Sequence, residues 1–398
     1  MRTRSTIGLF ACLSVLGVVG CDAPAADEAG ASSTEVTAAA SGAGLVLFVY
    51  DQGLQGIVRL EDLNGDGDAN DPGESAIFFD ATVPVTGVGN SIGLLALGPR
   101  TLLATDNASP ANIVRLDDRD ASGDAFGEGE HAVWFGGALP NGHRLAFPSR
   151  LDRAADGAIY FLEKNTLNTE NPEAIYRGVD ANGDGDVDDP GEVVEVARIA
   201  PPGAITSSAW DFALDPRGNI FVVDTYEKPE VGRYRSVDWF APGQPDRRRV
   251  YDNRTLFWTT EATERLVIGA TAGLAFDPRT GAIVHTALDL GWKSHIVAFK
   301  PAQPGTVHAS DFRVLWDEAI ADGPERTATP RDMRLLADGS IVFLDNVAKQ
   351  VVRLVDANGD GDFNDAGEYR VVFDAAAAAA AGGPRLTRLL SVAVAPLP

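Results

Sequence analysis

An internal repeat constrains the fold of this chain more than any other feature of its sequence. The stretch VRLVDANGDGDFNDAGEYRVVFD, which ends at Asp374, has close copies that end at Asp80 and Ala197 and a degenerate copy that ends at Gly136. Aligning the residue three positions before each acidic stretch gives intervals of 56, 62, 58, 63 and 55 residues between Arg59, Arg115, Arg177, Arg235, Ala298 and Arg353. The fourth and fifth copies keep the flanking apolar runs but lack the acidic stretch. This spacing indicates one structural unit repeated six times.

Each unit has the pattern of four short β-strands. In the sixth unit the apolar runs RDMRLL, SIVFLD, QVVRLVD and YRVVFD are separated by glycine, aspartate and asparagine. Such residues favour turns between strands. Repeats of four strands are typical of β-propellers, in which each unit is one blade and a closed ring buries the faces that a lone blade exposes.

The two ends of the chain predict how the ring closes. The body begins with a second strand, GLVLFVYD from Gly44, and the chain finishes with an unpaired first strand, LLSVAVAPL from Leu389. Pairing these segments completes a blade and leaves no open sheet edge. The sequence therefore predicts an all-β fold, a six-bladed β-propeller over residues 44–398 that is closed by pairing of the C-terminal strand with the N-terminal blade. Two separate domains are the alternative, which the spacing disfavours.

The acidic stretches have the composition of cation-binding loops. Oxygen-bearing side chains recur at positions 1, 3, 5, 7, 9 and 13, with glycine at position 6, and calcium prefers six to eight such hard oxygens. A turn alone needs one or two of these residues, and packed carboxylates repel one another unless a cation lies among them. The predicted Ca²⁺ ligands are Asp62, Asn64, Asp66, Asp68, Asn70 and Glu74 in the first loop, Asp180, Asn182, Asp184, Asp186, Asp188 and Glu192 in the third, and Asp356, Asn358, Asp360, Asp362, Asn364 and Glu368 in the sixth.

These loops resemble the EF-hand loop at positions 1 to 9, and more closely the calcium loops of integrin-type propeller repeats, which lie between strands. They depart from the EF-hand because position 12 is Gly73, Gly191 or Gly367, with glutamate one residue later. The acids at position 10 are alternative ligands. Magnesium fits less well, because it retains water and uses fewer protein ligands. Since the loops join the third and fourth strands at the outer rim, the predicted role of calcium is structural.

The degenerate loop of the second unit is predicted to be a weaker metal site. Its candidate ligands are Asp118, Asp120, Ser122 and Asp124. Phe126 stands at position 9 and removes one ligand.

The N-terminus is predicted to direct export and anchoring. Arg2 and Arg4 precede the apolar run IGLFACLSVLGVV, as in a cleaved signal peptide over residues 1–20. The ending VVGC resembles the lipobox of bacterial lipoproteins, which implies lipidation of Cys21; an ordinary secretory signal is the alternative. Residues 21–43 are rich in alanine, serine and acids and are predicted to form a flexible tether. The predicted location is the bacterial cell envelope, at the periplasmic face or the outer surface.

The net charge of −24 limits the classes of partner. It repels nucleic-acid phosphates and anionic headgroups, so nucleic acid is excluded and the membrane is contacted only through the N-terminal lipid. The chain is predicted to be a monomer. Its predicted ligand is a protein, a glycan or a small molecule.

Two functions stay open. The segments GLAFDPRTG and FALDPRGNIFVVDT are similar to segments of NHL-repeat proteins and of the gluconolactonase and senescence-marker family. This resemblance implies a lactonase-type hydrolase with a metal at the central channel. The glutamate expected on the first inner strand is absent, since Thr387 and Arg388 stand there. The alternative that the sequence favours is a binding or scaffold module without catalysis. Candidate channel residues lie where inner strands begin, and they are Ser149, Arg150, Trp210, Asp211, Arg331 and Asp332.

Overall fold

A computed structural model describes most of the predicted propeller. The described residues are 45–83, 88–108, 110–164, 173–199, 206–228, 232–244, 247–252, 267–268, 273–288, 294–300, 312–318 and 330–396. All of them belong to one compact unit, Ala40–Pro398. The predicted signal peptide, Cys21 and the tether lie outside the described residues. In the ranges given above, no helix has the length and apolar character needed to cross a membrane.

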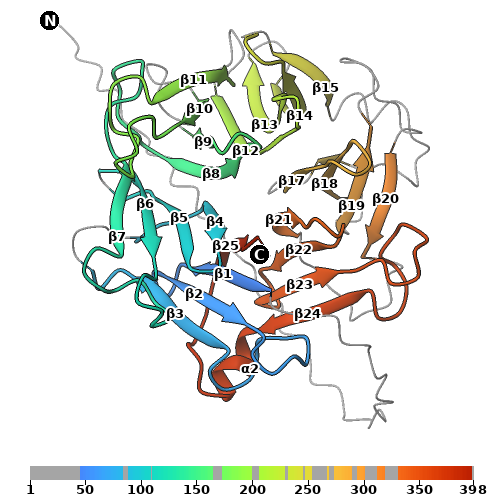
Figure 1. The fold of residues 1–398 in the computed structure, drawn as a ribbon. Helices are drawn as coiled ribbons and strands as arrows, with labels where there is room; N and C mark the ends of the chain where they lie inside the picture. Colours follow the sequence, from blue (N-terminus) through green and yellow to red (C-terminus); the bar gives the residue numbers. More distant parts are fainter. Residues whose placement is uncertain are drawn as a thin grey trace, which may run out of the picture. The chain divides into compact units, whose positions relative to one another are not determined.

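The described strands form six antiparallel sheets, which are the six predicted blades (Figure 1). Blade 1 consists of β25 (Leu389–Val394), β1 (Val46–Asp51), β2 (Gly56–Glu61) and β3 (Ser75–Asp80). Blade 2 consists of β4 (Leu94–Gly98), β5 (Thr101–Asp106), β6 (Asn112–Asp117) and β7 (His131–Phe135). Blade 3 consists of β8 (Pro148–Arg153), β9 (Ile159–Glu163), β10 (Ala174–Gly178) and β11 (Val193–Arg198).

The second half of the chain forms the other three blades. Blade 4 consists of β12 (Thr206–Leu214), β13 (Ile220–Lys228), β14 (Gly232–Phe240) and β15 (Arg248–Asp252). Blade 5 consists of β17 (Leu274–Asp277), β18 (Ala282–Leu288), β19 (Ser294–Phe299) and β20 (Phe312–Asp317), with the short β16 (Val267–Ile268) also paired to β18. Blade 6 consists of β21 (Arg331–Leu335), β22 (Ile341–Asp345), β23 (Gln350–Leu354) and β24 (Tyr369–Asp374).

The ring closes as the sequence predicts. The C-terminal strand β25 pairs with β1 in antiparallel register, with Leu47 opposite Val394 and Val49 opposite Val392. The innermost strands β25, β4, β8, β12, β17 and β21 contact one another in that order, and β21 returns to β25. The chain is therefore an all-β, six-bladed β-propeller.

The core lies between the blades. Along β1, Leu47 and Val49 pack into the cluster shared with blade 6, whereas Phe48 and Tyr50 pack into the cluster shared with blade 2. This alternation follows from the two-residue period of a strand that is buried on both faces. Among the described residues, each of the six interfaces between neighbouring blades has one such apolar cluster.

The antiparallel order of each blade separates its connections into two ends. The turn after the first strand and the loop after the third strand lie at one end, so the acidic loops lie opposite the end where the inner strands begin. The alanine run after β24 forms the short helix α2 (Ala375–Ala380), which Asp374 caps by accepting hydrogen bonds from Ala376 N and Ala377 N.

Candidate functional site

The three full acidic loops share one conformation. In the first loop, Asp62 accepts hydrogen bonds from Gly65 N (2.6 Å) and Gly67 N (2.9 Å). Both glycines have positive φ angles, 81° and 102°, which residues with a Cβ rarely adopt. Asp180 accepts the same two bonds from Gly183 N and Gly185 N, and Asp356 accepts the first of them, from Gly359 N. The position-1 carboxylate therefore closes each loop from within.

An amide group lies among the carboxylates of each full loop. Asn64 Nδ2 donates to Asp66 Oδ2 (3.2 Å) and to Asp71 Oδ2 (2.5 Å). The position-3 residues Asn182 and Asn358 make the equivalent pairs of contacts. Partial desolvation, followed by repulsion from neighbouring carboxylates, raises the pKa of Asp189 at position 10 of the third loop, whereas hydrogen bonds from Asp362 N and Asn358 lower the pKa of Asp360 in the sixth loop. The loops thus gather negative charge around a weak donor, at a place that suits a cation.

The position-13 glutamates hold the loop backbone. Glu74 is buried and accepts hydrogen bonds from Leu63 N (2.9 Å), Asn64 N (3.2 Å) and Asp71 N (3.0 Å). Glu192 and Glu368 are also buried and accept from the amides at positions 2 and 10 of their own loops. The sequence predicts that these glutamates are metal ligands. In the structure, their carboxylates accept hydrogen bonds from backbone amides.

Positions 8 and 9 fasten each loop to the preceding blade. Ala69 N donates to Val372 O (2.9 Å), and Asn70 Oδ1 accepts from Asp374 N (2.7 Å). In the third loop, Val187 N donates to Trp134 O, and Asp188 Oδ1 accepts from Gly136 N and Gly137 N. In the sixth loop, Phe363 N donates to Leu315 O, and Asn364 Oδ1 accepts from Asp317 N. The side-chain oxygens predicted to be position-9 metal ligands therefore bind a neighbouring blade, a role that sequence reasoning missed.

The degenerate loop brings its acids closest together. Carboxylate oxygens of Asp118, Asp120 and Glu130 lie within 4.8 Å of one another, the one such group of three among the described residues. Asp118 Oδ1 is buried without a hydrogen-bond partner, while Oδ2 pairs with Arg100 Nε at 3.3 Å. This orphaned buried oxygen suits a cation, because an unsatisfied buried acceptor is costly.

The other predicted residues of the degenerate loop have structural contacts. Ser122 N donates to Asp120 (2.9 Å), and Asp124 accepts from Phe126 N (3.1 Å). Phe126 itself stacks on Phe79 of blade 1, with ring centroids 5.7 Å apart. An apolar contact thus replaces the polar position-9 contact at this interface.

The central channel contains a buried ion network. Arg150 Nε on β8 lies 2.6 Å from Asp211 Oδ1 on β12, and Arg150 Nη1 pairs with Asp332 on β21. Asp332 also pairs with Arg334. Burial raises the pKa of Asp211 to about 7, against the opposing effect of Arg150. Of the predicted channel residues, Arg150, Asp211 and Asp332 are therefore brought together.

The network touches all six inner strands. Asp332 Oδ2 accepts from Ser391 Oγ (2.6 Å) and Val392 N (2.7 Å) on β25, and Asp211 Oδ2 accepts from Leu274 N (2.9 Å) on β17. Arg334 Nη2 donates to Leu94 O (3.2 Å) on β4. Sequence reasoning missed Arg334 and Ser391. The register of β21 shifts between Arg331 and Arg334, and Asp332 has a φ of 47°, so the regular alternation of a strand gave no signal for this cluster.

The remaining predicted channel residues lie apart from this network. Ser149 is buried and contacts Leu162 O through its hydroxyl (3.5 Å). Trp210 is partly exposed, and Lys164 Nζ lies 3.4 Å from the centre of its ring. Arg331 begins β21, where its backbone is opposite Leu344.

The described part of the chain places acids at the ends of several second strands, where they cap backbone amides. Asp51 accepts from Leu54 N (2.7 Å) and Thr387 N (2.8 Å). Glu163 accepts from Ala146 N and Phe147 N, both at 3.0 Å. These contacts join the second strand to the segment that precedes the first strand of the same blade.

The comparisons with known proteins show no family for this chain. No family model and no curated protein matches the sequence. Solved structures to which the chain is similar include a periplasmic gluconolactonase from Pseudomonas aeruginosa (12% identity, 89% of this chain and 100% of that chain, TM-score 0.48). They also include TolB from Acinetobacter baumannii (9% identity, 90% of this chain and 67% of that chain, TM-score 0.45) and the PQQ-bound aldose sugar dehydrogenase from Streptomyces coelicolor (16% identity, 82% of this chain and 92% of that chain, TM-score 0.45). With identities this low and TM-scores below 0.5, these likenesses say nothing about what this chain binds. The class that the fold and site define is a six-bladed β-propeller with acidic loops that join the third and fourth strands of a blade and contact the preceding blade.

Proposed function

We propose that this chain is an exported, lipid-anchored β-propeller that serves as a binding or scaffold module, with calcium in a structural role. The observation that carries the proposal is the position of the Arg150 guanidinium, between Asp211 and Asp332 in the channel. A catalytic metal needs convergent oxygens with an open coordination position. In this channel the two carboxylates are already neutralised by Arg150 and Arg334 and also accept backbone amides.

The alternative is a lactonase-type hydrolase acting at the channel. It requires Arg150 to leave both carboxylates so that a metal can bind them, which exposes charges that are now paired in a buried site. The same contacts give the channel a structural role, because they connect the six inner strands. We therefore favour the binding module.

Calcium belongs to the rim loops in this proposal. The residues that would hold it are the side chains at positions 1, 3, 5 and 7 of the three full loops, together with Asp118, Asp120 and Glu130 in the degenerate loop. The donors are all oxygens, as calcium prefers. When bound, the ion supplies positive charge that offsets the repulsion among the carboxylates. The loops then keep positions 8 and 9 in place against the preceding blade.

The test of the proposed function is a hydrolysis assay of the purified mature protein against a panel of sugar and aliphatic lactones, with and without added Ca²⁺ and Zn²⁺. We expect no hydrolysis above that of the Asp211→Asn variant. Lactone hydrolysis that Asp211→Asn or Asp332→Asn removes, with the melting temperature retained, would establish the hydrolase instead. Mass spectrometry of the mature N-terminus tests the anchor, for which the proposal requires a lipidated Cys21.

A further inference from the structure

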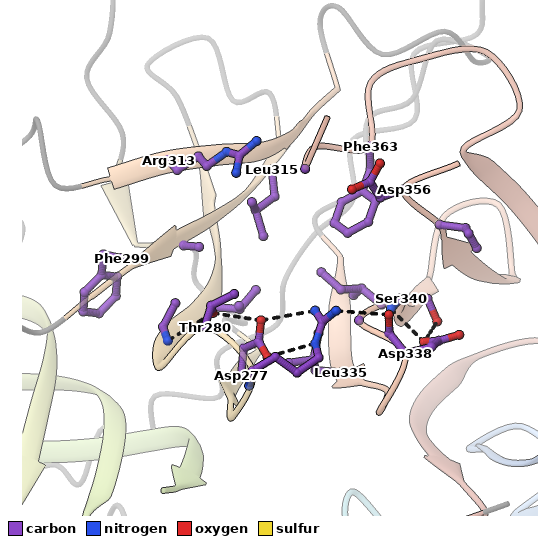
Figure 2. Close-up of a pocket in the computed structure, with 18 of the residues that line it drawn as sticks. Asp277, Thr280, Phe299, Arg313, Leu315, Leu335, Asp338, Ser340, Asp356 and Phe363 are labelled. Carbon is purple, nitrogen blue, oxygen red and sulfur yellow. Dashed lines mark hydrogen bonds and ion pairs between the residues drawn. The ribbon is translucent and has the colours of Figure 1, made fainter. Parts of the chain in front are cut away.

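A cavity of about 740 Å³ lies between blades 5 and 6, at the end of the propeller that carries the acidic loops. Its apolar walls come from both blades and include Val284, Leu315, Leu335, Ile341 and Phe363. Figure 2 shows Arg313 and Leu315 on one side of the cavity, with Phe363 and Asp356 beside them and Asp277 and Thr280 opposite. A volume of this size with mostly apolar walls is characteristic of small-molecule sites.

Beside this cavity, blade 5 has a small residue, Ala298, where other blades have a large one. In strand register, Ala298 lies opposite Val284, as Arg353 lies opposite Val342 in blade 6. Ala298 and Arg353 are each the second residue after the register shift between the third and fourth strands of their blade. The residues at that position in the other blades are Arg59, Arg115, Arg177 and Trp239. The sequence alignment was therefore wrong in blade 4, where Trp239 and not Arg235 is equivalent.

The neighbouring interface shows what a large side chain does at this position. The corresponding hollow between blades 6 and 1 is lined by Arg353 and has a volume of about 30 Å³. Arg353 donates to Asp338 (2.6 Å) and Ser340 (3.0 Å) and fills space beside its own sheet. Ala298 leaves that space open in blade 5.

The charges around the cavity favour an anionic group. Its three acids are engaged within the protein: Asp277 pairs with Arg279 (3.2 Å), Asp338 with Arg353 (2.6 Å), and Asp356 accepts from Gly359 N (2.7 Å). Among the described residues, Arg313 makes one hydrogen bond, to the carbonyl of Asp360 (2.7 Å), and its charge also acts on the Asp360 carboxylate without an ion pair. The guanidinium packs on Gly361, where a Cβ would lie 2.6 Å from its Nη2.

We infer that this cavity binds a small amphipathic carboxylate, with its apolar body against the walls between blades 5 and 6 and its carboxylate at Arg313. Lys300, which also lines the cavity, adds a second positive charge. A planar guanidinium is suited to two parallel hydrogen bonds with a carboxylate. The inference deepens the proposed binding function by naming a site and a ligand class. The inferred ligand can be wrong while the proposed function stands, because calcium binding and lactone hydrolysis are measured in the absence of this ligand.

The test is isothermal titration of the full chain with octanoate and with octan-1-ol, its uncharged counterpart. We expect octanoate to bind at one site. Ala298→Arg, which restores the arginine of other blades, should weaken octanoate binding at least tenfold by filling the cavity. Arg313→Gln should weaken octanoate binding at least tenfold and octan-1-ol binding less than threefold.

The matched control is Arg370→Gln. Arg370 is opposite Arg353 as Arg313 is opposite Ala298, and it likewise binds a loop carbonyl, that of Gly367 (3.1 Å). We expect octanoate affinity within twofold of the wild type for this variant. Absence of octanoate binding to the wild type, or a loss below tenfold in the cavity variants, overturns the inference. If Ala298→Arg does not fold, Arg313→Gln decides alone, since Arg313 is exposed on β20.

Discussion

Arg150 on β8 and Asp332 on β21 form an ion pair across the centre of the propeller, although they are 182 residues apart in the chain. Both side chains are largely buried, at 8% and 9% exposure. This pair, with Asp211, joins blades 3, 4 and 6, so these channel residues connect distant parts of the ring.

Arg150→Met is predicted to destabilise the fold strongly. It leaves Asp211 and Asp332 with fewer positive partners in a buried site, and breaking such a pair typically costs about 3–5 kcal/mol. Urea unfolding measures the change. The control is Arg198→Met, which removes an exposed pair with Glu195 and should cost about 1 kcal/mol or less. Equal effects of the two substitutions would contradict the structural role of the channel network.

Asp188→Ala is predicted to loosen the interface between blades 2 and 3. The carboxylate accepts from Gly136 N and Gly137 N at 2.9 and 2.8 Å, and losing a charged acceptor costs about 1–3 kcal/mol. The matched control is Asp186→Ala, whose only described hydrogen bond stays within the loop and whose loss should cost about 0.5 kcal/mol or less. Thermal unfolding of both variants in excess chelator separates this contact from any effect of calcium. The idea fails if the two melting temperatures coincide.

Glu368→Ala is predicted to destabilise the sixth loop. Glu368 is fully buried and accepts from Ala357 N (2.9 Å) and Asp365 N (3.0 Å), which lose their partner in the variant. Glu368→Gln retains one acceptor oxygen and should lie between the wild type and Glu368→Ala in free energy of unfolding. Hydrogen exchange should show faster exchange at Ala357 and Asp365 in Glu368→Ala. Unchanged protection at both amides would exclude this role for the carboxylate.

Glu163 is predicted to make the fold less stable as the pH rises. Burial raises the pKa of its carboxyl from 4.5 to about 7, although the amides of Phe147 and Ala146 oppose the shift. Because the pKa is higher in the folded state, the stabilisation that Glu163 contributes is fully present below pH 4.5 and is lost as the pH rises through about 7. The loss is at most about 3 kcal/mol, at about 1.4 kcal/mol per pKa unit.

The measurement is urea unfolding of the wild type and of Glu163→Gln from about pH 4 to about pH 8, a range that covers both pKa values. The stability of the wild type relative to Glu163→Gln should decrease across that window. A constant difference would show that Glu163 keeps an ordinary pKa in the folded state.

The sequence predicted the ring because its signals are local and repeated. The turn residues, the two-residue alternation in β1 and the complementary strands at Gly44 and Leu389 each follow from nearby residues, and together they determine six blades and their closure. The position of the acidic loops after the third strands followed from the same pattern.

The contacts between blades were not predictable in the same way. The pairing of Arg150 with Asp332 depends on which inner strands face one another across the channel, and no local pattern specifies this. The side chain of Asn70 can bind either a metal or a backbone amide. Its contact with Asp374 could be recognised only once the position of the neighbouring blade was known. Ala298 did stand out in the alignment, but the cavity that it opens depends on the register of β19 against β18.

The most direct measurement is a calcium titration of chelator-treated protein, followed by calorimetry and by melting temperature. We predict saturable binding and a rise in melting temperature, with about 2.7 kcal/mol of stabilisation per site at a hundredfold excess of calcium over Kd. The triple variant Asp62→Asn, Asp180→Asn and Asp356→Asn should lose most of both effects. No binding heat and an identical melting temperature with and without calcium would contradict a structural role for calcium in these loops.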